Sequence, residues 1–200
     1  MPPQILLSRT VCCDAQRATE LRICCNKTCR RQGALNLLEW AKELAPASLT
    51  VTRAGCLGVC GAGPNVVLLP RELRVSHCST PSHLARLLEL QLPESSGEVA
   101  LLAAALDLRL QGNAALERGD AARAVVLYTQ ALALKPPRNT HQILANLSAA
   151  RLRLGDPQRA LDDALAAQAV GPPGWTRGAE REAEARAAMK KEQDNVTALQ

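Results

Sequence analysis

Two cysteine pairs with short internal spacing stand out in the N-terminal half of the chain. Cys56 and Cys60 lie in residues 55–65, eleven residues that also contain four glycines and lead into the apolar residues 66–69. Cys24 and Cys29 form a second pair upstream. Thiols held this close either bind a metal or carry out thiol chemistry, and glycines let the backbone fold tightly around a bound group.

The elements that must position these thiols follow from apolar periodicity and turn residues. We expect a polar turn at 26–29, a helix over 33–44 ended by Pro46, and a closing helix capped by Ser82 and running to about residue 92. The expected strands cover residues 21–24, 49–54, 66–69 and 73–75, the last two as a hairpin. The order β-α-β-β-β-α is a thioredoxin-like layout. In such a sheet the two cysteine loops lie side by side at one edge, so the four thiols converge.

Three chemistries are open to four converging thiols. A [2Fe–2S] cluster takes two sulfurs on each iron, which suits two pairs on two loops. Zinc sites use similar short spacings. A thiol oxidoreductase would place Cys-x-x-Cys beside a helix N-terminus, and the sequence has no such motif. No acid–base pair accompanies the cysteines, so we do not expect an enzyme.

The motif itself narrows these choices. The sequence Cys24-x4-Cys29 followed by Cys56-Leu-Gly-Val-Cys60-Gly-x-Gly-Pro-Asn resembles the thioredoxin-like [2Fe–2S] ferredoxins. These are the Shethna-type ferredoxins, which are related to the small iron–sulfur subunit of respiratory complex I. The resemblance covers about residues 20–92 and implies a [2Fe–2S] cofactor bound by Cys24, Cys29, Cys56 and Cys60. Cys12 and Cys13 precede the domain and Cys78 lies beyond the motif, so we do not expect these three to be ligands. Cys25 would point to the opposite side of the strand end, although its adjacency to Cys24 leaves the choice between the two open.

Charge and composition argue against a nucleic-acid-binding or membrane-spanning protein and leave open the role of three cations beside the first cysteine pair. The net charge of +5 is spread along the chain, with eleven basic and eight acidic residues in 1–98 and thirteen and eleven in 99–200. With only three aromatic residues there is little to stack on bases, so we do not expect a nucleic-acid partner. No run approaches eighteen apolar residues, so no membrane span is expected. Lys27, Arg30 and Arg31 crowd the first cysteine pair, where they would stabilise a reduced cluster, dock an acidic partner or simply be solvated.

The C-terminal half has a different character. Residues 1–20 are expected to be a flexible segment or transit-peptide remnant, 21–92 the cysteine domain, 93–98 a polar linker and 99–200 a helical domain. Gly119-Asp120 recurs as Gly155-Asp156 thirty-six residues later, a period typical of helix-turn-helix repeats. Asp120 and Asp156 are predicted N-caps. A last helix from about 176 to 189 would cap the array.

This half resembles the tetratricopeptide repeat (TPR) family over about residues 102–190. The fold class is therefore α/β plus all-α. In the chaperone-binding branch of that family, basic and Asn side chains bind the C-terminal carboxylates of a partner protein. By resemblance, the concave face of the repeats would form a groove that binds an acidic C-terminal peptide. The matching positions are Arg109, Asn113, Asn146, Arg177 and Arg181. The alternative is that the two Asn residues of this set, Asn113 and Asn146, pack the turns of the repeats and that its arginines are exposed to solvent.

These features together predict a non-enzymatic redox protein that transfers electrons and docks to a protein partner through its helical half. The alternative is a scaffold, assembly factor or co-chaperone whose cluster is structural or senses redox state. A thiol oxidoreductase is a third class. The fusion of these two modules looks similar to plastid proteins of plants and algae. We therefore expect a chloroplast location, with the mitochondrion or cytosol as alternatives.

Overall fold

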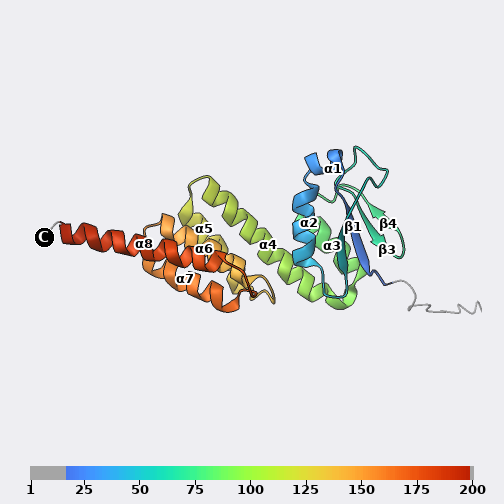
Figure 1. Cartoon of the computed structure of the whole chain (residues 1–200). Coiled ribbons are helices and arrows are strands. Elements are labelled where there is room, and N and C mark those ends of the chain that lie inside the picture. The colour runs from blue at the N-terminus through green and yellow to red at the C-terminus, as the bar shows by residue number, and fades with distance from the viewer. Residues whose placement is uncertain (1–16, 199–200) are drawn as a thin grey trace, which may run out of the picture.

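The computed structural model describes residues 17–198, in which a small four-stranded sheet packs against helices and a helical array follows (Figure 1). The strand order is β2-β1-β3-β4. Strand β1 (Glu20–Cys24) is parallel to β2 (Thr50–Ala54) and antiparallel to β3 (Val66–Leu69), which pairs with β4 (Leu73–Val75). The four expected strands are confirmed. Of the expected N-terminal segment, residues 1–16 lie outside the described part, whereas the backbone of Thr19 bonds to Leu69 and Thr50 beside the sheet.

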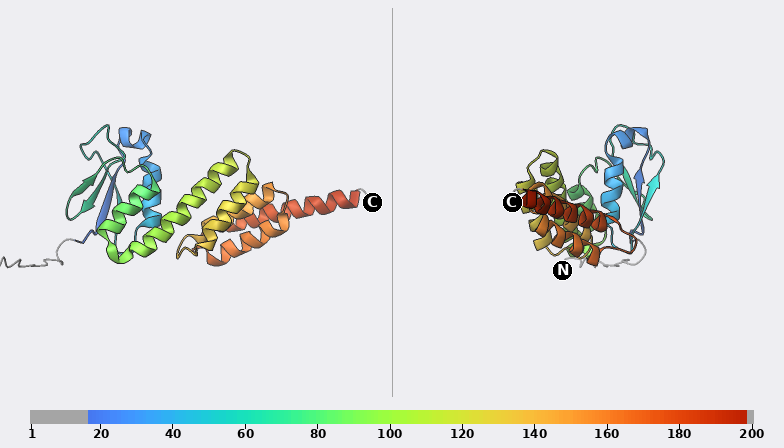
Figure 2. Two further views of the ribbon diagram at one scale, coloured as in Figure 1. Left: turned by 180° about the vertical axis from the view of Figure 1, so that it is seen from behind. Right: turned by 60° about the vertical axis from the view of Figure 1, so that its left-hand side comes forward.

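Two helices connect β1 to β2, and a third follows β4. They are α1 (Lys27–Arg31), α2 (Ala34–Leu44) and α3 (Pro81–Gln91). Helices α2 and α3 lie on one side of the sheet, where Leu21 and Ile23 of β1 share a core with their leucines (Figures 1 and 2). Successive side chains of a strand point to opposite faces of the sheet, so Arg22, which lies between Leu21 and Ile23, is exposed on the other face.

Two local predictions are corrected. The expected polar turn at 26–29 is largely helical, because the Asn26 side chain accepts a hydrogen bond from the Lys27 backbone N–H and caps α1. The cap of α3 is Thr80 and not Ser82. The Thr80 hydroxyl accepts a hydrogen bond from the His83 N–H at 3.2 Å, and Pro81 takes the first helical position.

The expected linker is also helical. Residues 93–98 form the 3₁₀ turn η1 (Pro93–Ser95) and the first residues of α4 (Ser96–Glu117). The N-terminal half of α4 places Val99, Leu102 and Leu106 in the core of the sheet domain, while Ala115 and Leu116 belong to the core of the helical half. Within residues 17–198, the stretch Pro93–Glu117 is the one helical segment long and apolar enough to span a membrane by length and composition. Several of its apolar residues belong to these two cores, whereas Leu101 is exposed.

Beyond α4 the chain forms antiparallel helix pairs with a repeated turn. Gly119 and Gly155 adopt positive φ values of 84° and 76°, which glycine allows without strain. The next residue in each turn, Asp120 or Asp156, caps the following helix as predicted. The helices are α5 (Ala121–Ala133), α6 (Thr140–Arg153), α7 (Pro157–Val170) and α8 (Arg177–Ala198). The last helix is longer than predicted and extends beyond the bundle in Figure 1.

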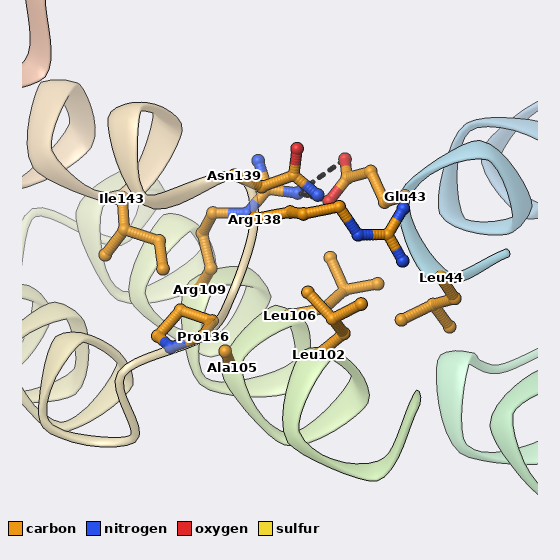
Figure 3. Close-up of a pocket in the computed structure, with 10 residues that line it drawn as sticks. All are labelled: Glu43, Leu44, Leu102, Ala105, Leu106, Arg109, Pro136, Arg138, Asn139 and Ile143. Atoms are coloured by element: carbon orange, nitrogen blue, oxygen red, sulfur yellow. Dashed lines mark hydrogen bonds and ion pairs between the residues drawn. The ribbon is translucent and has the colours of Figure 1, made fainter. Parts of the chain in front are cut away.

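The two halves are joined by polar contacts as well as by α4. The Arg109 guanidinium of α4 donates to both carboxylate oxygens of Glu43 on α2, at 2.7 and 2.8 Å (Figure 3). It also donates to the Gln142 side chain on α6. Arg138 donates to the backbone carbonyl of Ala45 at 3.0 Å and pairs with Glu98. These contacts fix the end of α2 against the helical half.

Candidate metal centre

The first cysteine pair lies where β1 ends. Strand β1 ends at Cys24, whose N–H donates to the Asn65 carbonyl at 2.9 Å, and Asn26 then starts α1. Helix α1 carries Cys29, and both Cys24 and Cys29 are 2% exposed. The predicted turn and the observed short helix differ in backbone shape, yet both place these thiols at the end of β1.

The second pair lies on the glycine-rich loop that follows β2. The Sγ atoms of Cys56 and Cys60 are 3.4 Å apart, and both residues are exposed. The Gly58 N–H points at Cys56 Sγ at 3.5 Å, and this contact is the main reason why the pKa of Cys56 is lowered. A backbone amide therefore faces a sulfur, which favours the thiolate form that binds metals.

Strand register brings the two pairs together. Cys24 pairs with Ala54 across the parallel strands, so the chain leaves both strands at the same edge of the sheet. Burial raises the pKa of Cys29, and its contact with the Cys24 thiol raises it further. The pKa of Cys60 is raised mainly by Cys56, with a smaller contribution from Cys24. Cys24 therefore contributes to the raised pKa of one thiol in each pair, Cys29 and Cys60.

Asn65 belongs to the candidate site, although the sequence predicted no role for it. It is 3% exposed, and its Nδ2 atom donates to the Val59 carbonyl at 2.7 Å and lies 3.7 Å from Cys29 Sγ. Hydrogen bonding from Asn65 lowers the pKa of Cys29, against the effect of burial. The Asn65 side-chain amide therefore links the cysteine loop to α1, and its backbone carbonyl accepts from the Cys24 N–H of β1. The Pro-Asn end of the motif was the available signal.

Gly63 allows the loop to approach Cys29 closely. A Cβ atom at this position would lie 2.7 Å from Cys29 Sγ and 2.7 Å from the Gln32 side-chain oxygen. Such a contact is too short for any side chain, so the close approach requires glycine.

The thiols form two pairs. Within residues 17–198, no group of three or more His, Cys, Asp or Glu side chains is arranged to hold a single metal ion. The donor set is nevertheless a suitable one for iron: soft sulfur ligands, with backbone and side-chain amides directed at two of them. The residues that would hold a binuclear cluster are Cys24 and Cys29 on one side and Cys56 and Cys60 on the other.

The remaining cysteines have different surroundings. Cys25 is half-buried and packs against the core of the sheet domain. Cys78 is 1% exposed, and burial raises the pKa of its thiol to about 11, which disfavours reactivity as a thiolate. Cys12 and Cys13 lie outside the described residues.

The predicted peptide-binding residues separate into two groups. Asn113 accepts hydrogen bonds from the Tyr128 hydroxyl at 2.7 Å and from Asn146 Nδ2 at 2.9 Å. Both Asn residues and Arg181 line a cavity of about 170 Å³, which Arg153 also lines although the sequence did not single it out. The other two predicted residues do not line this cavity: Arg109 is bound to Glu43, and Arg177 is exposed at the start of α8.

No protein-family model matches the chain, and no solved structure matches it at a significant level. The proposals below therefore depend on the residues and on the geometry of the described structure.

Proposed function

We propose that the chain is a [2Fe–2S] protein that transfers electrons and has no catalytic residue of its own. In this proposal residues 21–92 are a thioredoxin-like ferredoxin domain, and helices α4–α8 are a short TPR array. The observation that carries the proposal is that the two thiol pairs follow the neighbouring parallel strands β1 and β2 at the same edge of the sheet, with Cys56 and Cys60 exposed. A bound [2Fe–2S] cluster would supply one-electron chemistry.

The chain's own residues have distinct tasks in this proposal. Cys24 and Cys29 hold the buried side of the site, and Cys56 and Cys60 hold the side that faces solvent. The amides of Gly58 and Asn65 stabilise negative charge on sulfur, and amide contacts of this kind tune a reduction potential. Because one pair is exposed, a partner could approach the site closely without any opening of the fold.

The test is to characterise the purified full chain before and after reduction with dithionite. Visible absorption, EPR and analysis of iron, sulfide and zinc are expected to show a [2Fe–2S] cluster that is reduced by one electron. The chain supplies a matched pair of variants, since Cys24→Ser should abolish the cluster whereas Cys25→Ser, one residue away, should retain it. A colourless protein containing zinc, or one that turns over a dithiol and a disulfide, would overturn the proposal.

A second function is favoured by the cavity beside Asn113 and Asn146. In that case the chain is a scaffold, assembly factor or co-chaperone that binds an acidic C-terminal peptide, and its cluster is structural or senses redox state. Two guanidinium groups, those of Arg153 and Arg181, lie beside two amides, a combination suited to a carboxylate. Glu117 also lines the cavity, and Arg181 pairs with Glu184, so a peptide carboxylate would compete with these two acidic groups. A cluster that is not reversibly reduced, together with tight peptide binding, would favour this function.

Titration of the full chain with a peptide ending in acidic residues tests the groove. Arg181→Ala is expected to weaken binding, because Arg181 lines the cavity. Arg186→Ala is the matched control on the same helix, since Arg186 pairs with Glu182 and does not line the cavity. Equal affinity of both variants and the parent chain would exclude the groove as the binding site.

A further inference from the structure

The charged residues in the segments that form the cysteine loops are all basic. Residues 21–38 and 44–71, which form both cysteine loops, contain neither Asp nor Glu. Five exposed cations surround the loops: Lys27, Arg30 and Arg31 of α1, Arg53 of β2 and Arg74 of β4. Arg74 reaches the cysteine loop directly, because its guanidinium lies 3.4 Å from the Leu57 carbonyl.

These charges are not neutralised by the protein itself. Among residues 17–198, none of the five forms an ion pair, whereas Arg22 on the same sheet is paired with Glu20. The helix dipole accounts for only part of the set: Arg30 and Arg31 lie in the last turn of α1, where a cation is favoured, whereas Lys27 occupies the first position, where a cation is disfavoured. The cations are therefore available to an external anionic group.

The centre of this surface is less polar than its edge. Val59 is 37% exposed, and Leu57 is half-buried beside the exposed Cys56 and Cys60. An apolar centre with a charged rim is the usual composition of a transient protein interface. The surface therefore has the features of a protein-docking site.

The helical half leaves this surface uncovered. In Figures 1 and 2, α1 and the loops around it lie at the end of the sheet domain remote from the start of α4. The contacts to the helical half are made at the other end of α2, where Glu43 binds Arg109. The eleven residues of α2 span about 16 Å at 1.5 Å per residue, which separates the two regions.

We propose that this basic surface docks the redox partner, and that the partner is a protein with a carboxylate-rich patch around its own redox centre. The proposal rests on the proposed function, because electrons pass here only if the four thiols hold the cluster. A nucleic acid fits less well: the three aromatic residues (Trp40, Tyr128 and Trp175) lie on α2, α5 and the segment before α8, away from the cysteine loops. Opposite charges on the two proteins would steer their encounter.

The first test measures electron transfer from the dithionite-reduced full chain to two small oxidants of opposite charge. Each reaction moves one electron and no proton, reducing Fe(III) in hexacyanoferrate(III) or Co(III) in hexaamminecobalt(III). The rate with hexacyanoferrate should fall as salt is added, and the rate with the cobalt complex should rise. Combining Lys27→Glu, Arg30→Glu and Arg31→Glu should slow the hexacyanoferrate reaction about tenfold at low salt.

A control variant has the same net charge but leaves the surface intact. It combines Arg118→Glu, Arg123→Glu and Lys191→Glu, three exposed positions in the helical half, and should retain the parent rates. Reduction potentials are measured for each variant so that a change in driving force is separated from a change in encounter. If the triple Glu variant fails to fold, the same three positions are changed to Gln, and a smaller decrease in rate is expected. Rates that do not depend on the sign of the oxidant's charge would overturn the proposal.

The second test measures binding without electron transfer. Calorimetric titration with poly-L-glutamate should show salt-sensitive affinity that is lost in the triple surface variant and retained in Arg181→Ala, whose change lies in the groove. The reverse result would overturn the surface proposal. If poly(A) RNA or vesicles with anionic lipid bound as tightly as poly-L-glutamate and lost binding in the triple surface variant to the same extent, a protein would be excluded as the specific partner. Binding at the surface in a chain that carries no cluster would refute the proposed function and leave the acidic-docking surface standing.

Discussion

At the residue scale, the candidate metal centre depends on two residues beside the cysteines, Asn65 and Gly63. Asn65 directs its amide toward Cys29 and Val59, and Gly63 leaves the room that Cys29 needs. Neither residue is a candidate ligand. Both control how closely the loop approaches α1, and supporting residues of this kind affect a metal site nearly as strongly as the ligands do.

Gly63→Ala is expected to weaken iron retention about tenfold, the scale on which groups that support metal ligands act. The physical reason is steric, because the added Cβ would lie 2.7 Å from Cys29 Sγ. The measurement is iron per chain after a timed challenge with a chelator. Gly55→Ala is the matched control, since a Cβ at Gly55 meets no atom within 4 Å and should leave retention unchanged. Equal iron loss in the two variants would contradict the steric explanation.

At the element scale, the helix pairs are fixed by turns and by a few partly buried charges. The Asp163 carboxylate of α7 lies 2.8 Å from the Arg151 guanidinium of α6. Burial raises the pKa of Asp163 to about 6, despite the opposing effect of Arg151. The carboxyl pKa in an unfolded chain is about 3.9, so the folded state favours the protonated form.

This shift predicts a pH dependence of stability between about pH 4 and pH 6. Because the folded pKa is the higher one, the contribution of Asp163 is fully present below about pH 4 and is lost as pH rises through about 6. Asp163→Asn should therefore reduce the change in unfolding free energy between pH 4 and pH 7 by about 2 kcal/mol. Urea unfolding at several pH values measures this quantity. The exposed neighbour provides the control, and an Asp162→Asn profile that changes as much as that of Asp163→Asn would refute the assignment.

At the scale of the whole molecule, α4 makes the two halves one mechanical unit. Its first turns complete the core of the sheet domain and its last turns contribute to the core of the helical half. Arg109 then ties α2 to this helix in a pair whose side chains are 11% and 19% exposed. A partner held by the helical half would consequently be held at a fixed orientation to the cysteine loops.

Arg109→Ala is expected to destabilise the chain by about 2–3 kcal/mol, because it leaves the Glu43 carboxylate partly buried without its partner. Glu43→Ala should cost a similar amount, and the double variant should cost less than the sum of the two. Trp40 reports on the sheet domain and Trp175 on the helical half, so variants that keep one tryptophan follow each half separately. We expect coincident unfolding transitions in the parent chain and separated ones in Arg109→Ala. Separate transitions in the parent chain would disprove the mechanical coupling.

Local signals in the sequence were sufficient to predict most of the helices and strands. Pro46 follows the end of α2, Asp120 and Asp156 cap α5 and α7 as expected, and the four strands lie where apolar runs predicted them. The placement of the two thiol pairs after neighbouring strands was also predicted, because β1 and β2 are parallel and the loops that follow them leave the sheet at the same edge. The convergence of all four thiols on one cluster stays a prediction. These features depend on neighbouring residues or on chain connectivity, and sequence carries both.

Tertiary structure decided what depends on distant partners. Polar residues 93–98 predicted a linker, yet the leucines after them are buried against the sheet domain and extend the helix back to Ser96. Arg109 matched a peptide-binding position by sequence, but a carboxylate sixty-six residues away binds it instead. The contacts of Asn65, and the addition of Arg53 and Arg74 to the three cations of α1, likewise emerged only when separate segments met. The sequence by itself determined the elements and the thiol pairs, because short-range geometry specifies them. The fold decided which charges are neutralised and which remain available, because ion pairs form between residues that only folding brings within reach.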